Sequence, residues 1–257
     1  MKYKYSLIVG ATSGLGRALS ISLAGNNKNL ILIGKSRDKL TQLHKEISVI
    51  SSSMVLTEIV DLSVAENVQT TILNSSLPLN LEIEEIFYCA AIKYEGPSIE
   101  IDIKKLEAMM SVNYFSAVAI VKSFISNMSP SGDIFLVTSG AANFGAANDG
   151  AYSSTKAALE RFSEALRVEL IVKNINVTLI SPGPMATSLG NVINSFSGRT
   201  IIQNNVNSVD PSVIARKILL IKRRKIRRMN LVQSTKIIRF AALFFPSFLE
   251  LLISKKK

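Results

Sequence analysis

Cysteine and histidine are almost absent from this sequence of 257 residues, which contains one of each. Cys89 has no second cysteine to pair with and lies in the apolar stretch IFYCAAI, so we interpret it as a buried small residue in a reducing compartment. His44 lies in the polar helical pattern RDKLTQLHKEI, which is typical of a surface histidine. We therefore expect neither a metal site nor a Ser/His/Asp triad built on His44.

Acidic side chains are almost missing from the end of the chain. Residues 211–257 contain 13 Lys and Arg against 1 acidic residue, whereas residues 1–210 contain 17 against 18. The formal net charge of +11 therefore belongs to the C-terminal segment, and the rest of the protein is nearly neutral.

The N-terminus is first basic and then apolar, as in MKYKYSLIVGATSG, but its apolar run is too short for the core of a signal peptide. The glycines that begin at Gly10 end that run. We interpret the stretch as a first strand and expect a cytoplasmic protein.

Apolar runs of strand length alternate with stretches that have the helical period. The runs occur at 6–9, 30–33, 55–60, 84–89, 133–138 and 176–180. Such alternation is typical of an α/β fold, a doubly wound (Rossmann-type) parallel sheet with helices on both faces. We predict one domain over 1–210, in which the polar stretch 188–209 is a substrate loop. Residues 211–257 would form a basic, amphipathic extension.

The first predicted strand ends in VGATSGLGRAL, a glycine-rich turn into a helix. Glycines there allow the backbone to approach a pyrophosphate closely, and the unpaired N–H groups at the helix start attract the anion. The turn predicts a dinucleotide site formed by Gly10, Ser13, Gly14, Leu15 and Gly16. The plainer alternative is a tight connection between strand and helix.

The end of the second strand indicates which dinucleotide is preferred. NAD sites usually place a carboxylate there for the ribose hydroxyls, whereas the additional phosphate of NADP favours positive charge. In LILIGKSRDKL, Lys35 and Arg37 are able to pair with a 2′-phosphate, and Ser36 is able to donate a hydrogen bond to it. We expect Asp38 to cap the next helix. The sequence favours NADP(H) over NAD(H); the alternative is a solvated basic loop.

Over residues 5–187 the sequence resembles the short-chain dehydrogenase/reductase family. The glycines of the first turn match the family's Thr-Gly-x-x-x-Gly-x-Gly motif, with Val9 where threonine is usual. Asp61 and Leu62 match the pair that lies along the adenine in the family.

Two further stretches bear on the cofactor site. Ala90 matches the alanine of the family's Asn-Asn-Ala-Gly motif, whereas Tyr88, Cys89 and Ala91 depart from it. We expect that departure to alter the packing around the fourth strand and to leave the catalytic residues untouched. SPGPMAT matches the loop after the sixth strand, and the resemblance implies nicotinamide contacts from Pro182, Gly183 and Thr187.

The resemblance extends to a catalytic set of four residues. They are Asn113 in SVNYFSA, Ser139 in LVTSGAA, and Tyr152 with Lys156 in AYSSTKAAL. The resemblance implies that Asn113 holds a water that relays protons to the lysine. It also implies that Lys156 binds the nicotinamide ribose.

The chemistry of carbonyl reduction explains the remaining roles. A phenol with the ordinary pKa of about 10 is a slow acid or base at neutral pH, and a lysine one helical turn away favours the phenolate. Tyr152 is therefore predicted to be the acid in reduction and the base in oxidation, assisted by Lys156. Ser139, at a strand end, would polarise the substrate carbonyl. Singly, each residue has a plainer interpretation as surface decoration, a cap or a local hydrogen bond; their joint order carries the prediction.

The C-terminal extension combines a basic block with an apolar helical pattern. Six of the seven residues 222–228 are basic, and the apolar run 237–253 is interrupted by Arg239, Pro246 and Glu250, which argues against a membrane-spanning helix. We predict that 222–257 contacts an anionic membrane as a peripheral segment. In the alternative, its apolar side chains cover the substrate cleft or an oligomer interface: Phe240, Leu243, Phe244, Phe248 and Leu252.

Two classes of function are compatible with these patterns. The first is an NADP(H)-dependent oxidoreductase that reduces a ketone or aldehyde, or oxidises the corresponding alcohol, with a lipid-like or membrane-delivered substrate. The second is a non-catalytic cofactor-binding protein whose tail binds nucleic acid or a partner, against which the complete catalytic set argues. The resemblance implies a homodimer or homotetramer. The expected location is cytoplasmic, peripheral on the membrane face.

Overall fold

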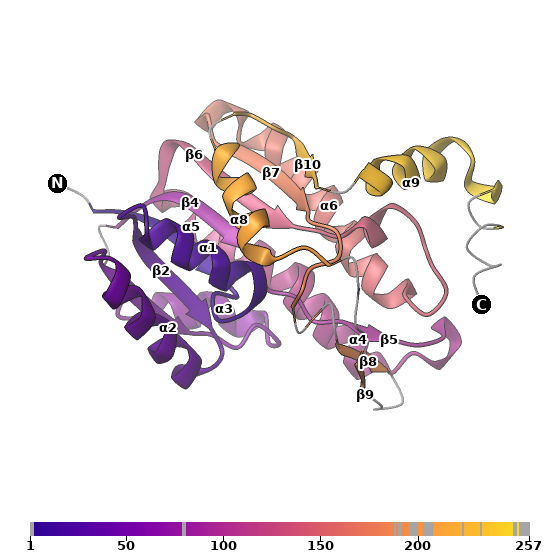
Figure 1. Ribbon diagram of the computed structural model, residues 1–257, viewed down its shortest axis with the longest axis horizontal. Coiled ribbons are helices and arrows are strands. Elements are labelled where there is room, and N and C mark those ends of the chain that lie inside the picture. The colour runs from indigo at the N-terminus through magenta and orange to yellow at the C-terminus, as the bar shows by residue number, and fades with distance from the viewer. Residues whose placement is uncertain are drawn as a thin grey trace.

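The computed structural model describes residues 3–78, 81–187, 189, 192–195, 200–202, 208–222, 224–231, 233–248 and 251. The main strands are β1 (Lys4–Val9), β2 (Asn29–Gly34), β3 (Val55–Ile59), β4 (Glu82–Tyr88), β6 (Met128–Val137), β7 (Asn176–Ser181) and β10 (Arg228–Asn230). They form one parallel sheet in the order β10-β7-β6-β4-β1-β2-β3 (Figure 1). The predicted doubly wound α/β fold is confirmed.

Helices cover both faces of this sheet. One face carries α1 (Gly14–Ala24), α2 (Arg37–Ile50) and α8 (Pro211–Leu220), and the other carries α3 (Glu66–Leu73), α5 (Ser116–Phe124) and α6 (Gly150–Glu169). A π-helical turn, η2 (Ser111–Phe115), joins α4 (Ile103–Met110) to α5, and α9 (Gln233–Phe244) follows β10. Short 3-10 turns are η1 (Ser98–Glu100), η3 (Ile125–Asn127), η4 (Gly140–Asn143) and η5 (Ile171–Lys173).

The first strand shows why its sequence is apolar without a break. Leu7 and Val9 pack into the cluster that includes α3, α5 and α6, whereas Ile8 packs into the cluster with α1, α2 and α8. All three side chains are fully buried. A central parallel strand must be apolar on both faces, and this requirement produced the strand pattern in the sequence.

The apolar helical run Ile103–Asn127 comprises α4, η2, α5 and η3. By length and composition it could cross a membrane, but half of its most apolar window is buried inside the protein. Ala117, Ile120 and Phe124 are among the side chains that it buries in the core. The run therefore serves this fold as a core helix that covers the sheet.

The structure places the end of the domain later than the boundary predicted at residue 210. Ile214, Ala215 and Ile218 of α8 are buried in the core, and β10 pairs in parallel with β7 as the edge strand of the sheet. The sequence signal was weak because β10 has only three residues and follows a run of charges. The first half of the predicted extension is thus an integral part of the domain.

Part of the basic block 222–228 is used inside the fold. Lys222 forms an ion pair with Glu85 of β4, and Arg228 forms one with Glu160 of α6; both carboxylates are buried. Arg224 lies exposed in the same block. The sequence predicted that this block lies on a membrane-contacting surface. Two of its positive charges instead pair with buried carboxylates.

The predicted substrate loop 188–209 lies largely outside the described residues. Within it, β8 (Val192–Ser195) and β9 (Thr200–Ile202) form a small sheet with β5 (Tyr94–Glu95). β5 follows the carboxyl end of β4. The described part of the loop is therefore attached beside that end of the main sheet.

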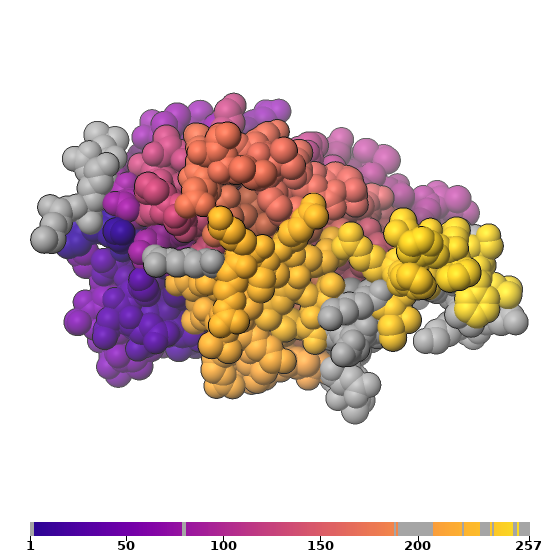
Figure 2. Space-filling view, turned by 90° about the horizontal axis from the view of Figure 1, so that it is seen from above, coloured from indigo at the N-terminus to yellow at the C-terminus, as the bar shows by residue number. Residues whose placement is uncertain are grey.

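The last helix, α9, stands at one end of the molecule, away from the main sheet (Figures 1 and 2). Its apolar side chains Ile237, Phe240, Leu243 and Phe244 are each more than half exposed. The rings of Phe240 and Phe244 lie 4.7 Å apart. α9 therefore presents an apolar surface that the described chain leaves uncovered.

Candidate active site

A cavity of 790 Å³ opens at the carboxyl edge of the parallel sheet. Chain segments that follow β1, β2, β3, β4, β6 and β7 contribute to its wall. Doubly wound sheets place their ligands at this edge, where the strand order reverses. The predicted site residues that line it are Gly10, Ser13, Gly14, Leu15, Lys35, Asp61, Leu62, Ala90, Ser139, Tyr152, Lys156, Pro182, Gly183 and Thr187.

The glycine turn is closely packed at both ends. Gly10 has a φ of +78°, and a Cβ there would lie 2.8 Å from the main-chain nitrogen of Ala90. A Cβ at Gly16 would lie 2.2 Å from the oxygen of Gly10, so Gly16 holds the turn from within and does not line the cavity. The side chain of Ser13, the N-cap of α1, makes no capping hydrogen bond. The first N–H groups of α1 have no partner within the helix, and Gly14 and Leu15 of that first turn line the cavity, which fits a pyrophosphate site.

Only one of the three predicted phosphate ligands lines the cavity, namely Lys35, which is exposed. Ser36 is the N-cap of α2 and accepts a hydrogen bond from the Lys39 nitrogen over 3.4 Å, and Arg37 is the exposed first residue of that helix. The cap predicted at Asp38 is wrong, because Asp38 lies inside the first turn. β2 ends without a carboxylate, and the cations beside it fit a dinucleotide with an additional phosphate.

Asp61 and Leu62 close the cavity at the end of β3. Asp61 accepts hydrogen bonds from the nitrogen and the hydroxyl of Ser63, over 2.9 and 2.7 Å, and these bonds, together with the charge of Lys35, lower the pKa of its carboxyl. Leu62 is buried, and its carbonyl accepts a hydrogen bond from the Ser111 hydroxyl over 2.9 Å. The third strand is thereby fastened to the helical run that carries Asn113.

Tyr152 lies in the first turn of α6 and is 7% exposed. Burial raises the pKa of its phenol to about 12, against the opposing effects of Lys93 and of a hydrogen bond with the Ser139 side chain. Asp149 raises this pKa further. Ser139, which follows β6, and Tyr152, on α6, both line the cavity.

Lys156 lies one turn after Tyr152 and is almost completely buried. Its Nζ donates a hydrogen bond to the main-chain oxygen of Val137 over 3.1 Å and lies 5.8 Å from the centre of the Tyr152 ring. Burial lowers the pKa of the ammonium group to about 8, although the Cys89 thiol opposes that shift. The lysine is thus held at the wall of the cavity, with a charge that is lost as the pH rises through about 8.

Asn113 lies in the π-helical turn and is fully buried, outside the cavity wall. Its side-chain amide binds the main chain of Ile92, accepting from the nitrogen and donating to the oxygen, both over 2.9 Å. It also donates to the Thr155 hydroxyl over 3.0 Å. Asn113 therefore fixes the segment after β4 against α6.

Three charged residues near the phenol were not predicted from the sequence, and Cys89 was not predicted to line the cavity. Lys93 and Glu95 line the cavity and Asp149 forms an ion pair with Lys93, but isolated charges between two motifs carry no period that would reveal this. Cys89 also lines the cavity and is only partly buried, which corrects the interpretation of it as a core residue. Burial nonetheless raises the pKa of its thiol to about 12. Cys89 directly follows a central strand, and this position was the signal in the sequence that it lines the cavity.

The chain matches known proteins in sequence. The family model described as short chain dehydrogenase matches residues 4–197. "Dehydrogenase/reductase SDR family member 7B" of Xenopus tropicalis is 30% identical over 223 residues, which are 83% of this chain and 72% of that protein. "3-ketodihydrosphingosine reductase" of Mus musculus is 28% identical over 181 residues, which are 68% of this chain and 54% of that protein.

The fold matches solved structures as well. A short-chain dehydrogenase from Sphingobium yanoikuyae in complex with NADPH superposes with a TM-score of 0.76 at 18% sequence identity, covering 99% of this chain and 96% of that one. This likeness concerns the fold, whereas the match to the family model covers most of the chain in sequence. The chain belongs to the short-chain dehydrogenase family of oxidoreductases.

Proposed function

We propose that this chain is an NADP(H)-dependent oxidoreductase that reduces a ketone or aldehyde, or oxidises the corresponding alcohol, with Tyr152 as the acid and base. The observation that carries the proposal is that three side chains from two parts of the fold lie on the wall of one cavity. Tyr152 and Lys156 come from successive turns of α6, and Ser139 comes from the segment that follows β6. A proton donor, a carbonyl-orienting hydroxyl and a buried cation are thus assembled together.

The cofactor site fits a nicotinamide dinucleotide phosphate. The glycine turn would hold the pyrophosphate, Lys35 with Ser36 and Arg37 would surround the 2′-phosphate, and Gly183 with Thr187 would face the nicotinamide end. When bound in its reduced form, the cofactor supplies the hydride. The NADPH in the Sphingobium structure supports a nicotinamide cofactor in this fold.

In reduction, the Ser139 hydroxyl donates a hydrogen bond to the substrate carbonyl and polarises it. As negative charge develops on the carbonyl oxygen, Tyr152 donates its phenolic proton to that oxygen and becomes a phenolate. The phenolate is stabilised by nearby positive charge, to which Lys156 contributes. In oxidation the same phenolate removes the proton from the alcohol.

Asn113 is proposed to support Ser139, Tyr152 and Lys156 indirectly, by binding the main chain of a neighbouring segment. Its amide holds the segment that begins at Ile92, and its bond to Thr155 fixes that segment to the residue beside Lys156. A water relay through Asn113 to the lysine stays a prediction from the resemblance.

The substrate is proposed to be lipid-like. Apolar side chains of Ile92, Val112, Phe144 and Met185 line the cavity beside the polar centre. The mouse relative that reduces 3-ketodihydrosphingosine, by its name, supports a substrate with an extended apolar part. The cavity volume of 790 Å³ lies within the usual range of ligand-binding pockets.

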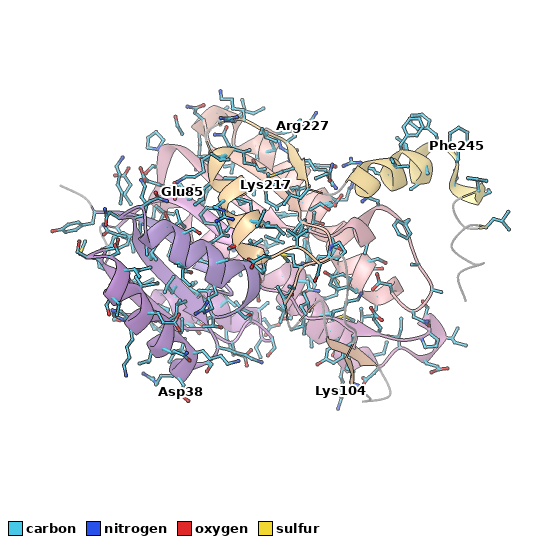
Figure 3. The ribbon with its side chains drawn as sticks, viewed as in Figure 1. Asp38, Glu85, Lys104, Lys217, Arg227 and Phe245 are labelled. Atoms are coloured by element: carbon cyan, nitrogen blue, oxygen red, sulfur yellow. The ribbon has the colours of Figure 1, made fainter. Side chains whose placement is uncertain are left out.

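The exposed face of α9 is proposed to contact an anionic membrane from the cytoplasm. Phe240, Phe244, Phe245 and Phe248 are each more than half exposed, and none of the described residues of 233–251 lines the cavity. Figure 3 shows Phe245 at the outer end of the molecule. Leu252, which the alternative from the sequence grouped with these apolar side chains, lies outside the described residues. Clustered aromatic and aliphatic side chains beside basic residues are typical of interfacial helices.

A homodimer or homotetramer is proposed through the helices that carry Asn113 and Tyr152. Phe115 of η2 is 48% exposed and Val168 of α6 is 66% exposed, so these helices offer apolar surface. A partner copy on that surface would leave α9 free to reach a membrane.

The deciding experiment compares the wild type with Tyr152→Phe. NADPH binding is followed by fluorescence, and NADPH oxidation is followed with a panel of ketones and aldehydes of increasing chain length. We expect roughly 10²- to 10⁴-fold loss of turnover with NADPH binding retained. Tyr94→Phe, at a second phenol on the cavity wall, is the matched control. Equal turnover in the wild type and Tyr152→Phe would disprove the acid role.

A further inference from the structure

Lys93 lies closer to the Tyr152 ring than Lys156 does. Its Nζ is 5.0 Å from the ring centre, compared with 5.8 Å for Lys156. Lys93 comes from the segment between β4 and β5, on the cavity wall, and its side chain is 24% exposed. The Tyr152 ring therefore has two ammonium groups near it, which come from different parts of the fold.

Two carboxylates hold Lys93 in this position. Its ammonium forms ion pairs with Glu95 of β5 and, over 3.1 Å, with Asp149 at the N-cap of α6. Burial by itself would lower the pKa of Lys93, but Asp149 and Glu95 raise it above its ordinary value. Lys156 has a pKa lowered to about 8 by burial. Of these two cations, Lys93 is the one that keeps its charge when the solution becomes mildly alkaline.

A cation over the face of a tyrosine ring discriminates between the two states of the phenol. The ring of a phenolate carries more negative charge than the ring of a phenol, and the attraction for a cation rises accordingly. Lys93 lowers the pKa of Tyr152, and Asp149 raises it. Lys93 and Asp149 therefore shift the pKa of the Tyr152 phenol in opposite directions.

We propose that Lys93 is an electrostatic positioning residue of the reaction, which stabilises the Tyr152 phenolate from the ring face and is oriented for this purpose by Asp149 and Glu95. The inference rests on the proposed function, because it concerns the acid and base of that reaction. It assigns to the segment after β4 a role in setting the pH at which the enzyme works.

Other charged or titratable groups surround the phenol on several elements. They are Cys89 after β4, Lys93, Tyr94 and Glu95 at β5, Lys105 on α4, and Asp149 and Lys156 on α6. Lys105 is placed over the Tyr94 ring, 5.3 Å from its centre, and thus is engaged with a different phenol. The Cys89 thiol is neutral below its raised pKa of about 12. Lys93, Asp149 and Lys156 are therefore the groups to vary.

The test measures the pH dependence of alcohol oxidation with NADP⁺, in which the rising limb reports ionisation of the base. Lys93→Met should move that limb to higher pH by about one unit, because the phenolate loses a cation and keeps two carboxylates beside it. Asp149→Asn should move it to lower pH, because a negative charge beside the phenol is lost while the ion pair with Glu95 still holds Lys93 at the ring, and the double variant should lie between the two. Lys104→Met, an exposed lysine on α4 (Figure 3), is the matched control and should leave the limb unchanged.

A purely structural role would not produce shifts of opposite sign. A limb for Lys93→Met that coincides with that for Lys104→Met would overturn the proposal, as would shifts of the same sign for Lys93→Met and Asp149→Asn. If the wild type neither oxidises an alcohol nor reduces a carbonyl compound, the proposed function is disproved, and the role of Lys93 is tested separately. The phenol is then titrated by carbon-13 NMR of ring-labelled tyrosine, assigned with Tyr152→Phe. The same opposite shifts are expected, and equal titration in all variants would overturn the role of Lys93.

Discussion

Arg228 of β10 forms an ion pair with Glu160 of α6, in which both side chains are at least nine-tenths buried. Glu160 also accepts a hydrogen bond from the Thr138 hydroxyl over 3.0 Å. Thr138 immediately precedes Ser139, and Glu160 lies one turn after Lys156. The edge strand from the basic C-terminal segment is thus bonded to the two elements that carry the proposed catalytic residues.

Arg228→Ala should destabilise the whole domain. The substitution leaves the Glu160 carboxylate buried without its cation, which costs about 3 kcal/mol of the free energy of unfolding. The urea midpoint, followed by circular dichroism, should fall in a single transition. Arg224→Ala, at an exposed position of the same block, is the control and should keep the midpoint of the wild type. An Arg228→Ala midpoint equal to that of the wild type would show that β10 does not contribute to the stability of the domain.

Lys35→Asp should reverse the preference between the two nicotinamide cofactors. The substitution replaces a cation on the cavity wall with a carboxylate, which repels a 2′-phosphate and accepts hydrogen bonds from ribose hydroxyls. NADPH affinity should fall by roughly tenfold or more, and NADH affinity should not fall. Fluorescence titration with each cofactor measures both constants.

Lys45→Asp makes the same charge change at an exposed position later on α2, outside the cavity. It should leave the ratio of the two affinities unchanged. An unchanged ratio in Lys35→Asp as well would argue against phosphate recognition at the end of β2.

The reduction rate should fall as the pH rises through about 8. Burial lowers the pKa of Lys156 to about 8, so its ammonium loses its proton above that pH, whereas the raised pKa of Tyr152 keeps the phenol protonated. One deprotonation lowers kcat/KM by roughly tenfold per pH unit above the pKa. Steady-state rates with NADPH between about pH 6 and about pH 10 measure the profile.

The comparison variant for this profile is Lys156→Met, which has no ammonium to titrate at that position. Its residual rate should be low and independent of pH in the same range. A wild-type profile that stays flat through the alkaline range would show that the reduction does not depend on a charged Lys156.

Substitutions on α9 should release the protein from anionic vesicles. Phe240→Ser combined with Phe244→Ser removes two exposed rings whose centres lie 4.7 Å apart, so the fold should be retained. Flotation with vesicles of phosphatidylserine and phosphatidylcholine should show binding of the wild type that persists at high salt, because apolar burial adds to charge attraction. The double variant should bind weakly and lose binding when salt is added.

Val49→Ser combined with Leu73→Ser removes two equally exposed apolar side chains from α2 and α3 and serves as the control. This control should float like the wild type. If salt abolishes the binding of the wild type to vesicles, and the wild type binds nucleic acid instead, the result would favour the alternative in which the basic segment binds nucleic acid.

The fold class and the order of the elements could be predicted from the amino-acid sequence alone. A strand buried on both faces must be apolar along its length, and this requirement made β1, β2, β4, β6 and β7 recognisable as apolar runs. The edge strand β3 is only partly buried, and its run was correspondingly more polar. The packing of Gly10 against Ala90 excludes a side chain, which explains the glycine that marked the first turn. Tyr152 and Lys156 share one face because a helix repeats every 3.6 residues or so.

Only the tertiary structure decided which distant residues meet. The contact of Lys93 with the Tyr152 ring, and the ion pairs of Lys222 and Arg228 with buried acids, join segments that are separated by many residues and have no common period. A charge in the sequence looks the same whether water or a buried carboxylate surrounds it. The three-residue strand β10 was also hidden, because its place in the sheet depends on pairing with β7 and not on its own pattern.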